Sequence, residues 1–410
     1  MISNNPKRTL LFVGGGRETL PGIFTAKEMG LDVAVSDRDY ECACSKAADY
    51  FLQADTYSVE ENLRQIRIHL ARGNRLDGVI CMATDVPFTV ACIAKEFGLP
   101  AYSVEAARVV SDKILMKNLF SKFALPIPWY GEVHDEKHFD EIIAKRGLPL
   151  VLKPVDSRGA RGVLLITSGV DTHWAFSYSK RFSPSNRVMA EEYLYGPQVS
   201  TESIVIDDAV FTIGFSDRNY ERINEYAPHI IEDGGDLPSK LPKSAQEKII
   251  KIVEKTASIL GIKNGIIKGD MVLHNDEAFI IEVATRLSGG YFCSDEIPLN
   301  TGVDIVKQAI KIAMGDKVII EDLIQTKNAA VSQRYLFPRP GKVEKISVAD
   351  WIKTSPHIAR LELNVKVGDI IQKTVNHPAR AGVVIATGKS PADSILRAKK
   401  AVNDIQITVS

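Results

Sequence analysis

Apolar positions in the first hundred residues gather into short runs that are separated by segments of helical period. Three such runs occupy residues 9–13, 32–36 and 77–83, and each has the length and composition of a buried strand. Amphipathic helical segments lie between them, so the order is β-α-β-α-β. That alternation predicts a parallel sheet in an α/β domain over residues 1–102.

The middle of the chain changes first to helix and then to hairpins. Residues 103–130 have a helical period that ends at the prolines of LPIPWY, so we expect a linker of helices there. Period-two segments follow over residues 131–326, with Asp207-Asp208 as one turn. A long amphipathic helix over residues 244–260 interrupts them. The pattern predicts a hairpin-rich α+β domain after the linker.

The last part of the chain repeats this alternation on a smaller scale. The strand-like segments GKVEKISV, LELNVKVGDII and AGVVIATG are followed by a helical segment over residues 392–402. We therefore expect a small α+β region over residues 327–410 that closes the structure.

Composition narrows the class of protein without giving a function. The chain has 410 residues, of which 45% are hydrophobic and 25% charged, as in ordinary soluble proteins of two or three domains. Lys plus Arg and Asp plus Glu both number 51, so no net field attracts nucleic acid or a membrane surface. No apolar run reaches membrane-spanning length, and the N-terminal segment lacks the features of a secretion signal. Five scattered cysteines have no zinc-ligand spacing, so we expect a cytoplasmic protein.

Three consecutive glycines, Gly14, Gly15 and Gly16, follow the first predicted strand. Such a turn begins the dinucleotide-binding fingerprint, but the fingerprint requires glycine or alanine where this chain has Thr19. Asp37 does match the acid that binds a dinucleotide ribose, so a dinucleotide-dependent oxidoreductase is one alternative. The other is that the glycines allow a sharp turn into a helix whose N-terminus faces an anionic substrate group.

A lysine and a loop of small residues form a candidate phosphate site in the segment VLKPVDSRGARGV. Lys153 lies on a strand, and the loop after it contains Ser157, Gly159, Gly162 and two arginines. A cation beside exposed amide groups suits a polyphosphate, although the same residues could form a solvent-exposed basic turn. Lys113, near the start of a linker helix, could reach the same phosphates or could be an ordinary solvated lysine.

The segment AEEYLYGPQ, residues 190–198, ends a strand in a Gly-Pro turn. Its backbone groups could face the edge of an adenine and its polar side chain a ribose. By itself, the segment could equally be an ordinary strand end.

The segment GDMVLHNDEAFIIEVATRLSGG predicts a hairpin with acids on both strands. Asp270 lies on the first strand and Glu282 on the second, so the two carboxylates can meet across the hairpin. Paired oxygen ligands suit Mg²⁺, which keeps the rest of its shell for phosphate and water; the alternative is a pair of exposed acids. Glu282 lies among apolar residues, so we expect it to have a cation partner. Arg286 would direct a planar cation at a phosphoryl or carboxylate group.

Taken in order, these segments resemble those of the ATP-grasp superfamily, and in particular its carboxylate–amine ligases. The shared features are the N-terminal βαβ domain, the LPIPWY linker, the VLKPV…GxxGV loop, the EEYLxG hinge and the IExxxRxSGG signature. This group includes biotin carboxylase, carbamoyl-phosphate synthetase, D-alanine–D-alanine ligase and bacterial L-amino acid ligases. The resemblance covers nearly the whole chain and implies a two-lobed ATP-grasp domain over residues 131–326.

The resemblance also implies a role for each candidate residue. For ATP it implies phosphate contacts from Lys113 and Lys153, a mobile lid with Ser157, Gly159 and Gly162, an adenine hinge at Glu191, Glu192 and Leu194, and a ribose contact from Gln198. For the metal it implies Asp270 and Glu282 as ligands of Mg²⁺, with Mn²⁺ as an alternative ion. For the reaction it implies that Lys268 steadies the transferred phosphoryl group and that Arg286 stabilises the acyl-phosphate and the tetrahedral intermediate. For the substrate it implies a pocket shaped by Gly14, Gly15, Gly16, Ser288, Gly289 and Gly290.

Two positions depart from the family pattern. Gln198 stands where the family usually has a glutamate, although an amide oxygen can still accept from a ribose hydroxyl. Ala284 stands where the commonest signature has an asparagine that binds the metal. The number of magnesium ions therefore stays open.

The resemblance implies an ATP-dependent ligase. Such an enzyme activates a substrate carboxylate as an acyl-phosphate, joins it to an amine, and releases ADP and phosphate. It would act on small molecules as a homodimer, without nucleic acid or membrane partners. Two further alternatives stay open: an ATP-dependent carboxylase or carbamoyl-phosphate-forming enzyme that uses bicarbonate, and a non-catalytic ATP-binding protein, which Ala284 favours.

Overall fold

The N-terminal part of the computed structural model, which describes residues 7–410, is a four-stranded sheet in the order β3-β2-β1-β4. Each neighbouring pair of strands is parallel. The elements are β1 (Thr9–Val13), β2 (Asp32–Asp37), β3 (Tyr50–Gln53), β4 (Gly78–Ile80), α1 (Leu20–Glu28), α2 (Val59–Ala71) and α3 (Pro87–Phe97). The predicted parallel sheet is confirmed. The sequence pattern missed β3, which is four residues long and mostly half-buried.

Two helices, α4 (Val104–Ser111) and α5 (Lys113–Lys122), occupy the predicted linker. Each begins after a residue whose side chain accepts a hydrogen bond from the first turn, Ser103 for α4 and Asp112 for α5. Asp112 ends α4 and caps α5, so the chain turns there. Helix α5 then presents Lys113 and Lys117 to carboxylates of the following sheets.

The next sheet has four antiparallel strands in the order β5-β8-β6-β7. Its strands are β5 (Tyr130–Val133), β6 (Leu150–Pro154), β7 (Leu164–Ile166) and β8 (Val188–Glu192). The helices α6 (Glu136–Arg146) and α7 (Thr172–Lys180) pack on it, and Phe139, Leu152 and Phe176 lie in the shared core. This sheet carries Lys153 on β6 and Glu191 on β8.

The largest sheet has eight antiparallel strands in the order β13-β12-β9-β10-β11-β14-β18-β16. Its strands are β9 (Gln198–Ile206), β10 (Ala209–Asn219), β11 (Gly234–Leu237), β12 (Gly265–His274), β13 (Glu277–Ala284), β14 (Ala330–Leu336), β16 (Ile358–Leu363) and β18 (Gly382–Gly388). The long helix α9 (Lys243–Leu260) packs on it through Ile249 and Val253. Asp207 and Asp208 form the β9–β10 turn with φ of +48° and +69°, as a two-residue turn of this type requires.

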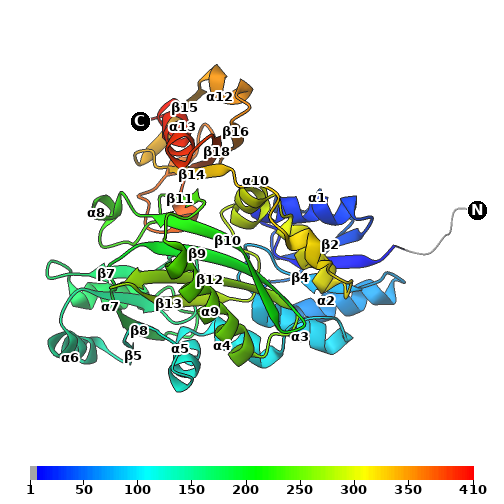
Figure 1. Ribbon diagram of the computed structural model, residues 1–410, viewed down its shortest axis with the longest axis horizontal. Coiled ribbons are helices and arrows are strands. Elements are labelled where there is room, and N and C mark those ends of the chain that lie inside the picture. Colours follow the sequence, from blue (N-terminus) through cyan, green and yellow to red (C-terminus); the bar gives the residue numbers. More distant parts are fainter. Residues whose placement is uncertain (1–6) are drawn as a thin grey trace, which may run out of the picture.

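The C-terminal part extends the large sheet and adds a small one. Strands β15 (Gly341–Val348), β17 (Ile370–Ile371) and β19 (Ile405–Val409) form a separate three-stranded sheet. The remaining helices are α8 (Ile223–Tyr226), α10 (Ile297–Thr301), α11 (Ile305–Ala313), α12 (Asp350–Thr354) and α13 (Pro391–Asn403). In Figure 1 the orange-to-red C-terminal part lies above the green strands of the large sheet, and the blue N-terminal domain lies beside those strands. The large sheet crosses the boundary predicted near residue 327, so the domain limits stay a prediction.

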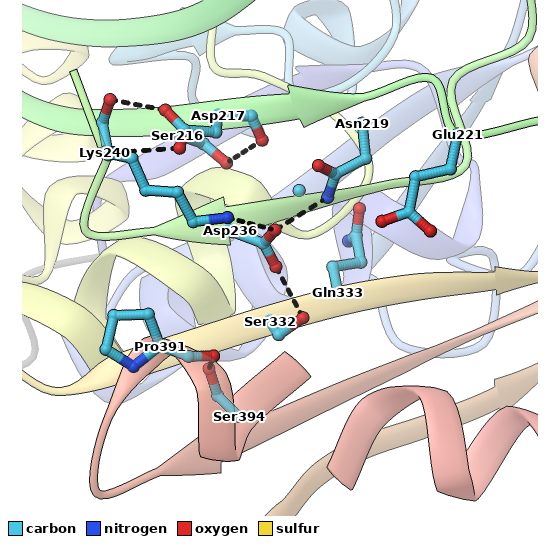
Figure 2. A network of polar contacts seen from close by, with 12 residues as sticks. Ser216, Asp217, Asn219, Glu221, Asp236, Lys240, Ser332, Gln333, Pro391 and Ser394 are labelled. Carbon is cyan, nitrogen blue, oxygen red and sulfur yellow. Dashed lines mark hydrogen bonds and ion pairs between the residues drawn. The ribbon is translucent and has the colours of Figure 1, made fainter. Parts of the chain in front are cut away.

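A buried ion pair joins the C-terminal strands to the centre of the large sheet. Asp236 on β11 accepts hydrogen bonds from Arg334 (2.9 Å) and Ser332 (2.7 Å) on β14, and from Asn219 (3.0 Å) on β10. Figure 2 shows this carboxylate between the strands, with the Lys240 ammonium 3.8 Å away. Burial raises the pKa of Asp236, but Arg334 outweighs burial and holds that pKa below its usual range. The strands on both sides of the pair are therefore fixed to one another.

Candidate functional site

A cavity of about 720 Å³ brings most of the predicted site residues together. Its walls come from the N-terminal domain, both larger sheets and the C-terminal part. The predicted residues on the walls are Gly16, Lys113, Lys153, Ser157, Gly159, Glu191, Glu192, Leu194, Gln198, Lys268, Asp270, Glu282, Arg286, Ser288, Gly289 and Gly290. Gly14, Gly15 and Gly162 are predicted residues that do not line it.

The N-terminal glycines mainly shape their own turn. The N–H of Gly14 donates to the Ser36 carbonyl (2.8 Å), and the N–H of Gly15 donates to the Asp37 carboxylate (2.8 Å). Only Gly16 reaches the cavity. The Asp37 carboxylate, which had suggested a contact to a dinucleotide ribose, anchors this turn.

The loop after β6 is held over the cavity from two sides. The Lys113 ammonium donates to the Ser157 carbonyl (2.9 Å), and the His377 N–H of the C-terminal part donates to the Gly159 carbonyl (3.0 Å). Gly159 and Gly162 have φ of +62° and +73°, which favours glycine. Gly162 lies outside the cavity lining because it packs against its own sheet, where neighbouring side chains leave no room for a Cβ.

Two buried lysines share one buried carboxylate beside this loop. Glu191 is 2% exposed, and its two oxygens lie 2.5 Å from the ammonium groups of Lys117 and Lys153. Burial raises the pKa of Glu191, but Lys117 and Lys153 together outweigh burial and keep that pKa below its usual value. The Glu191 side chain is therefore engaged in positioning Lys153, and the residue itself pairs with Tyr130 and Val151 within the sheet.

The predicted hinge has free peptide groups. Within residues 7–410, no hydrogen bond uses the backbone of Tyr193 or Leu194, although both residues line the cavity. Glu192 is exposed at the end of β8, and its own N–H donates to the Trp129 carbonyl (2.9 Å). Gln198 opens β9 on the same wall. This rim offers unpaired donors and acceptors to a planar heterocycle.

The two acids of the β12–β13 hairpin face each other as the sequence predicts. Asp270 and Glu282 are direct partners in the strand register, next to a β-bulge. The Asp270 carboxylate accepts from Ser200 (2.7 Å) and pairs with Arg218 (3.2 Å) and Lys268. Burial raises the pKa of Asp270, but Arg218 and Lys268 outweigh burial and lower that pKa strongly. The Asp270 carboxylate is thus ionised, as a metal ligand would need to be.

The second acid is also held by a cation. The Glu282 carboxylate lies 3.3 Å from the Lys113 ammonium, which is the cation partner expected from the sequence. No three His, Cys, Asp or Glu side chains gather into a metal site within residues 7–410. The donor set is therefore two carboxylates, since Ala284 offers no oxygen from its side chain. It fits Mg²⁺, which binds through one or two carboxylates and takes further ligands from phosphate and water.

Arg286 is oriented by an aspartate of the N-terminal domain. Its Nε donates to Asp85 (3.2 Å), and the other oxygen of Asp85 lies 3.4 Å from Arg158 of the loop after β6. The Arg158 guanidinium also lies over the Tyr57 ring at 4.4 Å. Burial raises the pKa of Asp85, but Arg286 and Arg158 outweigh burial and lower it. Asp85 thus links the loop to the arginine at the predicted reaction centre.

The signature that ends at Gly290 is fixed by two glutamates. The Gly290 N–H donates to Glu18 (2.8 Å) and the Ser288 N–H to Glu202 (3.0 Å). Burial raises the pKa of the Glu202 carboxyl to about 8. These contacts hold the backbone at 288–290 against the cavity.

Sequence reasoning missed Lys117, Asp85, Arg218 and Glu202. Each contacts a predicted residue from a distant segment, so no local motif contains both partners. A single signal was available for Lys117, because SDKILMKN places a second lysine one helical turn after Lys113.

Family comparisons agree with this geometry. Residues 110–290 match the model of a family described as "ATP-grasp domain", and residues 334–410 match "L-amino acid ligase C-terminal domain 2". Residues 110–290 therefore form an ATP-grasp domain. Its ATP-grasp match contains the Lys113, Lys153 and hairpin positions described above.

Individual relatives are distant. The uncharacterized protein y4rH of Sinorhizobium fredii is 25% identical over 349 residues, which are 83% of this chain and 70% of that protein. Human carnosine synthase 1 is 23% identical over 334 residues, 75% of this chain, and the match spans 40% of that protein's length. The crystal structure of L-amino acid ligase from Bacillus licheniformis superposes with a TM-score of 0.82 at 18% identity and covers 100% of both chains. The ATP-grasp fold is therefore shared over the whole chain.

Proposed function

We propose that this ATP-grasp protein is an ADP-forming ligase that activates a small carboxylate and joins it to an amine. The observation that carries the proposal is the in-register pair of Asp270 and Glu282 on the wall that also holds Lys268 and Arg286. The match at residues 334–410 to the C-terminal domain of L-amino acid ligases supports a ligase over the other ATP-grasp activities.

The proposed reaction has two steps. A carboxylate oxygen of the substrate attacks the γ-phosphorus of ATP, the bond to the β–γ bridging oxygen breaks, and ADP leaves. An amine then attacks the acyl carbon, the bond to the phosphate oxygen breaks, and phosphate leaves with the electron pair. The amine loses a proton to form a neutral amide. Holding both substrates in one enclosed cavity lowers the entropic part of the barrier.

The residues of the cavity have separable roles in this scheme. Two lysines are placed to neutralise phosphate charge. Lys153 is held by Glu191, and Lys113 donates a hydrogen bond to the Ser157 carbonyl of the loop. Arg286 is placed to stabilise the negative charge that develops on the acyl group, because its guanidinium is oriented by Asp85. The free peptide groups at 193–194 would bind the adenine edge.

Asp270 and Glu282 would hold Mg²⁺, with Mn²⁺ as a substitute. When bound, the ion would offset charge on the transferred phosphoryl group. Two cations hold the Asp270 carboxylate in place independently of the ion. Arg218 pairs with it from β10, and Lys268 pairs with it from β12.

Hydroxylamine trapping tests the proposal directly. Purified protein, MgATP and hydroxylamine are mixed with single carboxylic and amino acids, and hydroxamate is measured together with ADP. At least one acid should give equal amounts of both products, because hydroxylamine intercepts an acyl-phosphate. ATP binding without ADP release for every acid would instead support a non-catalytic ATP-binding protein. ADP formation that requires bicarbonate and no other acid would support a carboxylase.

The proposal extends to the location and assembly of the protein. No helix within residues 7–410 combines the length and apolar character needed to cross a bilayer. All five cysteines are free thiols, which supports a reducing, cytoplasmic compartment. A homodimer stays a prediction, and sedimentation analysis would test it.

A further inference from the structure

A buried carboxylate that the proposed reaction does not use lies on the cavity wall. Glu296 ends the π-helical turn η2 (Phe292–Glu296) and is 2% exposed. Its Oε2 atom has no hydrogen-bond partner within residues 7–410. A buried polar atom without a partner is costly, so its place on the wall of a binding cavity indicates that a ligand group completes it.

The surroundings of Glu296 favour a cationic group. The neighbouring cations already hold other carboxylates: Arg334 holds Asp236 (2.9 Å), Arg218 holds Glu232 (2.8 Å) and Arg360 holds Asp295 (2.8 Å). Burial, and then the negative charges of Glu232, Asp295 and Asp236, raise the pKa of Glu296. Arg334 lowers this pKa in part, but no ion pair within the described residues joins a cation to Glu296.

A serine hydroxyl lies close to this carboxylate, beside a glycine of β11. A Cβ built on Gly235 would lie 3.5 Å from Glu296 Oε2 and 2.7 Å from Ser216 Oγ. Gly235, Ser216 and Glu296 all line the cavity. A side chain at position 235 would press on Ser216 beside Glu296, so glycine keeps the serine hydroxyl and the glutamate together on the cavity wall.

The strand register gives the distance from this position to the metal carboxylates. Asp270 pairs with Ser200 on β9, and Ser200 pairs with Ser216 on β10. Neighbouring strands lie about 4.8 Å apart, so Ser216 is roughly 10 Å from Asp270. A carboxylate activated beside Asp270 is thus separated from Glu296 by several bonds of substrate chain.

We infer that Glu296 binds an ammonium group on the side chain of the acid that is activated, so that the substrate is a diamino acid such as ornithine or lysine. The inference rests on the proposed ligase function. An α-ammonium group alone is too close to the activated carboxylate to reach Glu296. The side-chain ammonium would donate to Glu296 and Ser216 and would supply the missing counter-ion.

Matched amino acids test the inference. L-Ornithine and L-lysine are compared with L-norvaline and L-norleucine, which have the same carbon chains without the side-chain ammonium. Hydroxamate and ADP formation give KM and kcat for the wild type, Glu296→Gln and the exposed control Glu254→Gln. A lost charge-assisted hydrogen bond should raise KM for ornithine or lysine roughly 10- to 100-fold in Glu296→Gln. KM for ATP, and all constants of Glu254→Gln, should stay unchanged.

Each outcome separates the inference from the function on which it rests. If the wild type uses norvaline and norleucine as well as ornithine and lysine, the inference is wrong while the ligase function stands. A uniform loss in Glu296→Gln for all four acids would likewise overturn it, because Glu296 would then bind the α-ammonium group or act on the fold. Gly235→Ala, whose Cβ would displace Ser216 Oγ beside Glu296, should also impair ornithine and lysine selectively. No product from any acid would contradict the proposed function itself.

Discussion

The buried Lys117–Glu191–Lys153 cluster gives a quantitative prediction about the ATP-grasp domain. In Glu191→Gln, two ammonium groups lose the carboxylate that lies 2.5 Å from each of them. Lys117 is fully buried, and burial already lowers its pKa to about 8 despite the neighbouring Glu191. Breaking a buried pair by removing one partner costs about 3–5 kcal/mol. The lower half of this range is expected, because Lys117 can lose its proton instead of remaining a buried charge.

The assay is thermal unfolding followed by calorimetry. The ATP-grasp domain, residues 110–290, has a size for which the melting temperature changes by about 2–4 °C per kcal/mol of stability. For a loss of about 3–4 kcal/mol, the expected decrease in melting temperature is ~6 to 16 °C. Glu192→Gln is the matched control, since this neighbouring glutamate is exposed at the strand end. Exposed substitutions usually change stability by less than about 0.5 kcal/mol.

Bound nucleotide should reduce the decrease in melting temperature that Glu191→Gln causes. Lys153 lines the cavity whereas Lys117 does not, so phosphate oxygens can replace Glu191 as the partner of one lysine only. MgATP should therefore recover part of the loss in Glu191→Gln. Equal melting temperatures for Glu191→Gln and Glu192→Gln would refute the reasoning, because the cluster would then contribute nothing to stability.

Four further predictions concern the reaction centre. Arg286→Ala should still bind ATP but lose about 2.7–4 kcal/mol of transition-state stabilisation. The rate of ADP release measures this loss, with Arg67→Ala, at an exposed position of α2, as the control. Full turnover by Arg286→Ala would contradict the role of Arg286. Asp85→Asn should lower kcat about 10- to 100-fold, as expected for a lost charged hydrogen bond to Arg286, with little change in the KM for ATP. Chelation by EDTA should stop hydroxamate formation in the wild type and excess Mg²⁺ should restore it, whereas Asp270→Asn should require much more Mg²⁺. Glu202 has a pKa of about 8 in the folded chain against an ordinary 4.5, so its contribution to stability is present below pH 4.5 and is lost as pH rises through 8. The stability of Glu202→Gln relative to the wild type should therefore increase between pH 5 and 8 by up to about 1.4 kcal/mol per pH unit, measured by urea unfolding.

The hairpin that carries Asp270 and Glu282 could be predicted because local features determine it. Asn275 and Asp276 both adopt positive φ at its turn, which is typical of asparagine and aspartate. The turn and the alternation of apolar residues fix the register, and the register places Asp270 opposite Glu282. The other hairpins and the parallel N-terminal sheet follow from the same short-range rules.

The roles of Glu191 and Asp85 could not be predicted in this way. In VMAEEYL nothing distinguishes the buried Glu191 from the exposed Glu192, because both faces of β8 are covered and the deciding lysine comes from α5. Asp85 and Arg286 are 201 positions apart, and only the packing of the N-terminal domain on the large sheet brings them together. For the same reason the sequence did not show that Gly14 and Gly15 lie behind the cavity wall.

If Asp270 and Glu282 hold Mg²⁺ as proposed, the ion pairs of the cavity favour joint binding of nucleotide and metal. Lys268 pairs with Asp270, and Lys113 pairs with Glu282, so each of the two carboxylates is already neutralised by a lysine. A divalent ion alone would have to displace both ammonium groups and leave them without partners, which is unfavourable in a partly buried site. Phosphate oxygens change this balance, because they give the two lysines a new partner as the carboxylates turn to the ion. The same four side chains can therefore stabilise the free site and, after exchanging partners, the site that holds a metal-bound triphosphate.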